Sequence, residues 1–247
     1  MIKKMLMVLM TLAIFVTLLP AETPEELILQ GDALYAQRRD PLLAAQAWAK
    51  YQEALRLAPD NYTVLWKNAQ VMYFIGDNST SSAEKLKIFK QAMDICKKAI
   101  ALRPNGVEGH YWLGVHTGSY GETRGVLKSL FLKGDIISEM NKAIAIDGSY
   151  EKGGAYCVLG RLYFKVPGLF GGSNKKSRQN LEKCRQMAPK NSVNLLFLAE
   201  TYWDMDEKEM AIRTLEELVS MDPDPDWIPE TEKDKVEGRK LLKKYKG

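Results

Sequence analysis

The chain has 247 residues, of which 46% are hydrophobic, so it is long enough to bury the core of one sizeable domain. Its formal net charge of +4 is too mild to favour nucleic acid as a partner, and no basic stripe with interleaved aromatic residues occurs. Its three cysteines and two histidines form no cluster with metal-ligand spacing, so we expect neither a metal nor a cofactor.

The first segment, residues 1–21, is typical of a secretory signal peptide. Lys3 and Lys4 precede an apolar run over residues 5–19, and the small residue Ala21 follows. The run is short for a transmembrane span, although retention as an uncleaved membrane anchor is the alternative. We therefore expect an exported, periplasmic protein, whose only route to the membrane is an uncleaved N-terminus.

Five nine-residue segments then share one pattern. Each begins with a large apolar residue, has a small or medium apolar residue three places on, and ends in a helix-stopping proline or glycine. Because positions three, four and seven apart share a helical face, each segment is predicted to be the last two turns of an amphipathic helix. Five copies indicate a helical repeat array. The segments are residues 51–59, 96–104, 140–148, 181–189 and 215–223.

A partner helix lies upstream of each segment, with small residues where two antiparallel helices need to approach closely. The spacing nears the ~34 residues of a tetratricopeptide repeat in the last unit, and the earlier units are longer. The predicted units cover residues 25–59, 62–104, 107–148, 153–189 and 193–223, with a capping strap and helix at 224–247. The repeat positions are Gly31, Ala54, Pro59, Ala99, Pro104, Gly114, Ala143, Gly160, Pro189, Ala199, Ala211 and Pro223.

The predicted fold is therefore all-α: a tetratricopeptide-like α-solenoid of about five helix pairs plus a C-terminal capping helix. It forms a single domain over residues 22–247, because one repeat cannot bury its apolar face without a neighbour. An irregular helical bundle is the alternative.

The third unit carries the candidate ligand site. Its aromatic residues run through several glycines, and glycine within a helical pattern marks close backbone packing or a site. The functional interpretation is a pocket lined by Tyr111, Trp112, His116 and Tyr120. The alternative is a tightly packed inner helix that needs glycine to fit. His110 and His116 would lie well apart around a helix, so they are not expected to share a metal ion.

The cysteines and the glycine-rich loop at 165–177 give no indication of a further functional site. Cys96, Cys157 and Cys184 are expected to be buried thiols, with a Cys157–Cys184 disulfide as the alternative. The loop is not a phosphate loop, because Lys175 occupies the place where that motif needs glycine.

Several of these blocks resemble one family of exported tetratricopeptide proteins. Residues 110–131, 153–177 and 196–202, with the proline strap and its final helix, are similar to the T components (TatT) of tripartite ATP-independent periplasmic (TRAP) transporters. The resemblance implies an all-helical periplasmic protein that works beside a TRAP substrate-binding protein and helps to deliver a small hydrophobic ligand. It supplies no catalytic residues.

The expected function is thus a protein-interaction module accessory to a TRAP-type transporter, with a protein partner and a small hydrophobic ligand. We expect no enzyme, because Glu122, Arg124 and Glu200 are not paired with a nucleophile or metal at a meaningful spacing. The alternative is a non-transport adaptor for cell-envelope assembly, which would use the same array without a ligand. A homo-oligomer is compatible with either.

Overall fold

The computed structural model describes residues 22–247, and over this range it contains α-helices and short 3-10 helices but no β-strand. The prediction of an all-α fold is therefore confirmed. Residues 1–21 lie outside the described part of the chain, so the signal peptide remains a prediction. None of the described helices combines the length and the hydropathy that a membrane crossing requires.

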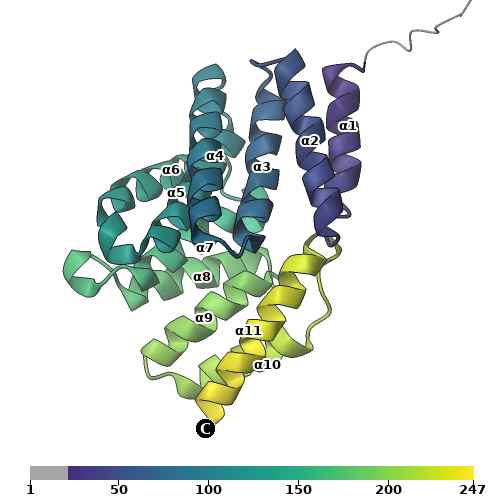
Figure 1. Cartoon of the computed structure of the whole chain (residues 1–247). Helices are drawn as coiled ribbons and strands as arrows, with labels where there is room; N and C mark the ends of the chain where they lie inside the picture. The colour runs from purple at the N-terminus through teal and green to yellow at the C-terminus, as the bar shows by residue number, and fades with distance from the viewer. Residues whose placement is uncertain (1–21) are drawn as a thin grey trace, which may run out of the picture.

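The helices pair along the chain, and each pair stacks on the next (Figure 1). The α-helices are α1 (Pro24–Tyr35), α2 (Pro41–Leu57), α3 (Tyr62–Asn78), α4 (Ser82–Leu102), α5 (Val107–Arg124), α6 (Lys133–Asp147), α7 (Tyr150–Lys165), α8 (Asn174–Met187), α9 (Ser192–Asp204), α10 (Lys208–Ser220) and α11 (Ile228–Lys246). The 3-10 helices are η1 (Val126–Leu132), η2 (Gly168–Phe170) and η3 (Pro225–Trp227).

Side-chain caps and proline set the helix ends. Thr23 begins α1 with a capping box to Glu26, and Asn61 and Asn191 cap α3 and α9 by accepting backbone N–H groups. Helix α2 ends just before Pro59, and α4 and α8 end in the same way before their prolines. Helix α5 continues through Gly118 and Gly121 and ends only at Gly125, where φ is 101°.

Small residues set the distance between paired helices. A Cβ added at Gly31 would lie 2.5 Å from Tyr51 Cε1, and one at Gly160 would lie 2.5 Å from Leu181 Cγ. Gly114 faces only the terminal methyl of the flexible Met140 side chain, so it is the first and fourth pairs that have room for hydrogen alone at these positions. The alanines of the repeat positions are fully buried, namely Ala54, Ala99, Ala143, Ala199 and Ala211.

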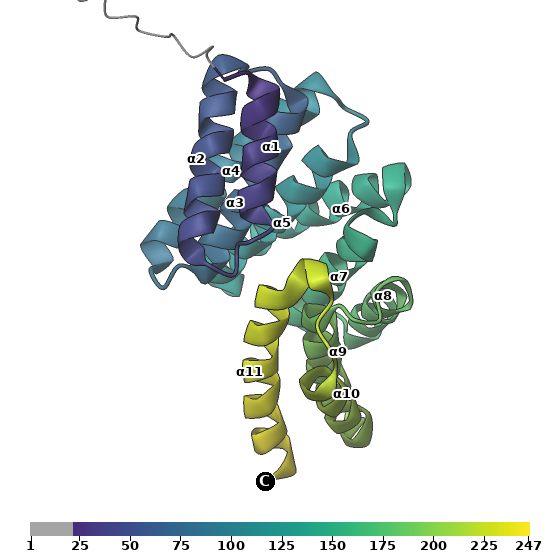
Figure 2. The same ribbon diagram turned by 90° about the vertical axis from the view of Figure 1, so that its right-hand side faces the viewer.

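The array of helix pairs curves, so that the last helix, α11, comes back to the first helix, α1. Figure 2 shows the N-terminal end of α11 beside the lower ends of α1 and α2, while the rest of α11 packs along α9 and α10. Helix α11 therefore covers the fifth pair and also contacts the first. The three cysteines are free and buried, so the alternative of a Cys157–Cys184 disulfide is not what the structure contains.

We expect Gly160→Leu to lower the free energy of unfolding by about 2–4 kcal/mol, because the new side chain would collide with Leu181 and with the backbone oxygen of Ser177. Thermal and urea denaturation would measure the change. Gly134→Leu is the matched control, since a Cβ there meets no atom within 4 Å. Equal stability of Gly160→Leu and the wild type would mean that α7 and α8 are not in contact at this position.

Candidate functional site

A cavity of about 820 Å³ lies on the inner face of the array. The first helix of each of the five pairs contributes to it, and η1, the start of α6, η3 and the start of α11 complete its wall. Because the inner helices come from every unit, no single repeat could form this site alone. The aromatic residues in the wall are Tyr35, Tyr73, Phe74, Tyr111, Trp112, Phe197 and Trp227.

The aromatic part of the wall is tightly ordered. Tyr111 meets Trp112 edge to face with ring centroids 5.0 Å apart, and Tyr73 lies 5.8 Å from Trp112. The indole N–H of Trp112 donates to the hydroxyl of Tyr150 at 3.3 Å. These contacts fix the rings, and Tyr111 and Trp112 are only 9% and 5% exposed, so each presents a small but rigid apolar surface to the cavity.

Among the acidic residues that line the same cavity, Glu151 and Asp234 have carboxylates that are largely removed from water. Burial raises the pKa of Glu151, and the polar contact to its side chain comes from the Gln70 amide at 3.4 Å. Burial also raises the pKa of Asp234, to about 6, although its Oδ2 accepts a hydrogen bond from the Ser192 hydroxyl at 2.7 Å. Each carboxylate therefore retains acceptor capacity for a cationic group that enters the cavity.

The backbone at Glu151 is strained. Glu151 has φ of 48° and Lys152 has φ of 53°, both in the left-handed region that non-glycine residues rarely adopt, and Gly153 follows at 82°. This turn directs Glu151 to the cavity and lets the Lys152 ammonium pair with Asp224 at 2.8 Å. Strain of this kind persists where the surrounding contacts hold it, and it is common at functional sites.

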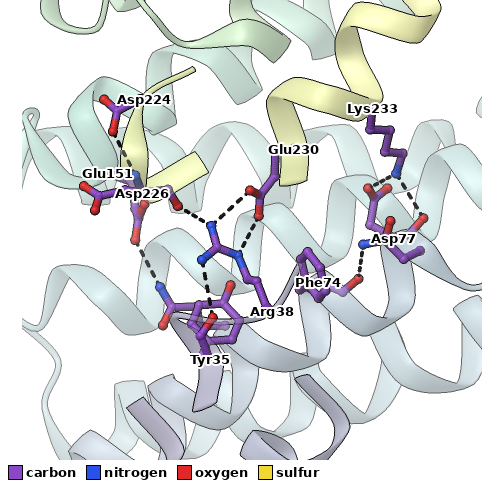
Figure 3. A network of polar contacts seen from close by, with 11 residues as sticks. Tyr35, Arg38, Phe74, Asp77, Glu151, Asp224, Asp226, Glu230 and Lys233 are labelled. Carbon is purple, nitrogen blue, oxygen red and sulfur yellow. Dashed lines mark hydrogen bonds and ion pairs between the residues drawn. The ribbon is translucent and has the colours of Figure 1, made fainter. Parts of the chain in front are cut away.

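A set of polar contacts, which we call the clasp, closes one side of the cavity (Figure 3). The Arg38 guanidinium donates from Nε and Nη2 to the two carboxylate oxygens of Glu230, at 2.8 and 3.0 Å, and also to the backbone oxygen of Asp226. Lys233 pairs with Asp77. The clasp thus joins the end of α1 and the end of α3 to the first turns of α11, which are distant in sequence.

Arg38 is suited to this position because it is held on several sides. Only 7% of the residue is exposed, and its guanidinium lies 4.7 Å from the centroid of the Tyr35 ring and 5.7 Å from that of Phe74. A planar guanidinium that stacks on aromatic rings is already restricted in its movement, so it loses little further conformational entropy when it binds both oxygens of a carboxylate. The neighbouring Arg39 makes an exposed pair with Glu232 instead.

The structure divides the four predicted ligand residues. Tyr111 and Trp112 line the cavity, whereas His116 and Tyr120 are not part of its wall. His116 is fully buried and donates from Nε2 to the carbonyl of Ala69 at 2.9 Å, and burial lowers its pKa to about 4, so it is neutral. Tyr120 packs against the aromatic cluster around Trp112.

Sequence reasoning missed Arg38, Glu151, Asp234 and Glu230. No local motif contains them, because they come from the first unit, the fourth unit and the capping helix, and only the curvature of the array assembles them. One signal was available for Glu151: it precedes the pair Gly153-Gly154 at a helix start, where a special backbone conformation is common. Among residues 22–247 no group of three or more His, Cys, Asp or Glu side chains is placed to hold a metal ion.

Antiparallel helix pairs stacked around an inner cavity define a protein of the tetratricopeptide-like repeat fold. The chain belongs to the family of regulator of microtubule dynamics proteins 1-3, whose sequence model matches residues 27–246. It is 24% identical over 242 residues to "Regulator of microtubule dynamics protein 1" of Bos taurus, a match that covers 90% of this chain and 72% of the bovine protein.

One solved structure supports the fold. TTC0263, a thermophilic tetratricopeptide protein of Thermus thermophilus, superposes with a TM-score of 0.66 at 17% identity, over 89% of this chain and 99% of that one. The structure of MamA gives a TM-score of 0.47 at 20% identity, over 84% of this chain and 96% of that one. The prediction of a tetratricopeptide-like solenoid is therefore confirmed by the first of these likenesses.

The predicted membership of the TRAP T-component (TatT) family is wrong, because the family match and the bovine relative both identify another family. Part of the glycine content of these blocks serves close packing, as at Gly154 and Gly160, whereas a Cβ at Gly118 would meet no atom within 4 Å. Any tight helix pair needs small residues there, so they do not distinguish one tetratricopeptide family from another. The TRAP substrate-binding protein loses its support as a partner for the same reason.

We expect Arg38→Met to destabilise the clasp by about 1–3 kcal/mol, because Glu230 and the carbonyl of Asp226 lose their charged donor. Hydrogen exchange of residues 224–234 should increase more than exchange in α3–α6. Arg39→Met is the matched control, and loss of its exposed pair should change stability by less than about 0.5 kcal/mol. Equal hydrogen exchange of residues 224–234 in the two variants would show that Arg38 does not hold this segment in place.

Asp234→Asn should remove a pH dependence of stability. The folded-state pKa of Asp234 is about 6 and its ordinary value is 3.8, so between these values the folded chain holds a proton that the unfolded chain releases. The free energy of unfolding of the wild type therefore falls by about 1–3 kcal/mol on account of this group as pH rises through this window. Asp234→Asn has no carboxyl group to titrate, so this fall is absent from the variant. The nearby charges Lys233, Asp77 and Glu230 remain in both proteins.

Urea denaturation of both proteins at pH 4 and pH 7.5 would measure this difference. The titration of His116 has the opposite sign in an overlapping range, but it cancels when the two proteins are compared. A stability difference between variant and wild type that is the same at both pH values would show that Asp234 is not buried as described.

Proposed function

We propose that this chain is a non-enzymatic protein-interaction module that binds an extended segment of a partner protein in the inner cavity. The observation that carries the proposal is the combination of a rigid aromatic wall with two incompletely satisfied carboxylates, Glu151 and Asp234, in one cavity. Such a site binds by contact and charge, and it offers no pairing of a nucleophile with a base.

The two buried carboxylates, together with the aromatic wall, favour one kind of segment. An apolar or aromatic side chain of the partner would pack against Tyr73 and Trp112, and a lysine or arginine would pair with Glu151 or Asp234. Binding of a cation would stabilise both carboxylates in their ionised form, so association should release protons near neutral pH. A small hydrophobic ligand is the competing occupant, and native mass spectrometry of the purified chain would reveal it by its mass.

A display library of random peptides selected on the immobilised full chain would test the proposal. We expect the selected peptides to be enriched in a basic residue next to an aromatic or aliphatic one. Glu151→Gln should weaken their binding by about tenfold or more, because a charge-assisted hydrogen bond is lost. Glu53→Gln on the exposed face of α2 is the matched control. Selection of acidic or uncharged peptides, or equal affinity for the two variants, would contradict the proposal.

The name of the bovine relative suggests a second candidate function, association with microtubules. Family membership over residues 27–246 is the observation that favours it. Co-sedimentation with polymerised tubulin would test it: the chain is expected in the pellet, at a level that Glu151→Gln reduces if the cavity makes the contact. A chain that stays in the supernatant at micromolar tubulin would exclude this partner while leaving the peptide proposal open to its own test.

Export to the periplasm through residues 1–21, with an uncleaved N-terminus as the alternative that would attach the chain to the membrane, is also part of the proposal. Its support is the pattern of Lys3 and Lys4 before an apolar run. N-terminal sequencing of the protein from its native cell tests this directly. A mature chain that begins near Glu22 would support cleavage, and an intact Met1 would contradict it.

A further inference from the structure

Two short 3-10 turns expose large apolar side chains at one edge of the molecule. In η1, Leu127 is 68% and Phe131 65% exposed, and in η2, Leu169 is 90% and Phe170 47% exposed. The Lys133 ammonium, directly after η1, donates to the carbonyl of Phe170 at 2.7 Å and so joins the two turns. We call these four side chains the apolar knob, and Figure 1 shows the α5–α6 and α7–α8 connections that carry it together at the left.

The knob belongs to a fixed turn. The carbonyl of Pro167 accepts hydrogen bonds from the backbone N–H of Phe170 at 2.9 Å and of Gly172 at 3.1 Å. Gly171 has φ of 86°, and a Cβ on Gly172 would overlap the carbonyl of Val166, so both positions require glycine. The glycines therefore fold the chain back sharply at this point, and the turn leaves Leu169 almost fully in water.

A set of basic side chains flanks the knob in the sequence, within or next to the same two connections. In the described part of the chain none of them forms an ion pair, whereas Glu122, the nearby acid of α5, is already paired with Arg161 at 3.2 Å. Asp135 is the exposed acid that follows η1. The basic residues are Arg124, Lys128, Lys133, Lys165, Lys175 and Lys176.

From these observations we infer that the apolar knob docks the protein onto the surface of an anionic lipid bilayer. Leucine and phenylalanine at a protruding tip suit the boundary of headgroups and acyl chains. Lys133 and Lys165 also line the inner cavity, so the cations that we expect to meet acidic headgroups are Lys128, Lys175 and Lys176, next to the knob in the sequence. Five of the six cations are lysines, which are depleted at protein interfaces but suit a diffuse anionic surface.

The test places an environment-sensitive fluorophore, NBD, on the full chain at Leu169→Cys. The native cysteines are buried and free, so the added thiol is selectively labelled, and labelling of the unchanged chain verifies this. Leu29→Cys on α1 is the matched control, since Leu29 is 68% exposed. The apolar residues 5–19 offer a separate way to attach to vesicles, and for this reason the readout is local to each label.

We expect the Leu169→Cys label to shift to the blue and to be quenched by brominated lipid on equimolar phosphatidylcholine–phosphatidylglycerol vesicles, but not on phosphatidylcholine alone. The Leu29→Cys label should not respond. Adding Lys175→Glu and Lys176→Glu should weaken the response by at least about 30-fold, because loss of each lysine near the surface costs about fivefold and each new glutamate is repelled as well. Acidic residues suit the first turn of α8, so the fold is retained.

The remaining outcomes overturn the proposal. These are an unchanged Leu169→Cys label on anionic vesicles, an equal response at Leu29→Cys, or an equal response on neutral vesicles. Lys87→Glu with Lys90→Glu, on the exposed face of α4, is the charge control, and an equally large effect of that pair would remove the role of the basic residues around the knob. An unchanged label would leave the knob as a surface for a protein partner.

Discussion

The close approach of paired helices is the constraint on which the rest of the structure depends. Gly31 against Tyr51 and Gly160 against Leu181 leave room for hydrogen alone, and buried alanines have the same effect elsewhere in the array. Because each pair is narrow, consecutive pairs stack with their first helices on the inner face. That arrangement brings aromatic residues from several units to one cavity, and it brings α11 back to α1.

The clasp is a consequence of this curvature. Arg38 could meet Glu230 only if the array turns far enough for its ends to approach, and the contact then fixes how far the array opens. The cavity is therefore bounded by the packed inner helices on one side and by the ion pairs of the clasp on the other. Under the proposed function, partner binding and opening of the array would be linked, since a segment that enters near Glu151 would also lie close to the residues that hold the strap.

The fold could be predicted from the sequence, and the site could be predicted only in part. The nine-residue helix ends and the small residues at fixed spacing are local signals, so they indicated stacked helix pairs. Tyr111 and Trp112 were recognised because glycines accompany them on one helix. Arg38, Glu151 and Asp234 carry no local pattern, since their meeting depends on the summed curvature of five units. His116 does share the local aromatic pattern of its helix, but it lies on the packed side, where its side chain binds the carbonyl of Ala69 and does not face the cavity.

The most direct test is a crystal structure of the full chain with a peptide selected for binding. It should show the peptide along the inner helices, with an apolar side chain against Trp112 and a cationic group beside Glu151 or Asp234. A peptide bound instead on the outer helices α2, α4 and α8, with the inner cavity unchanged, would contradict the account.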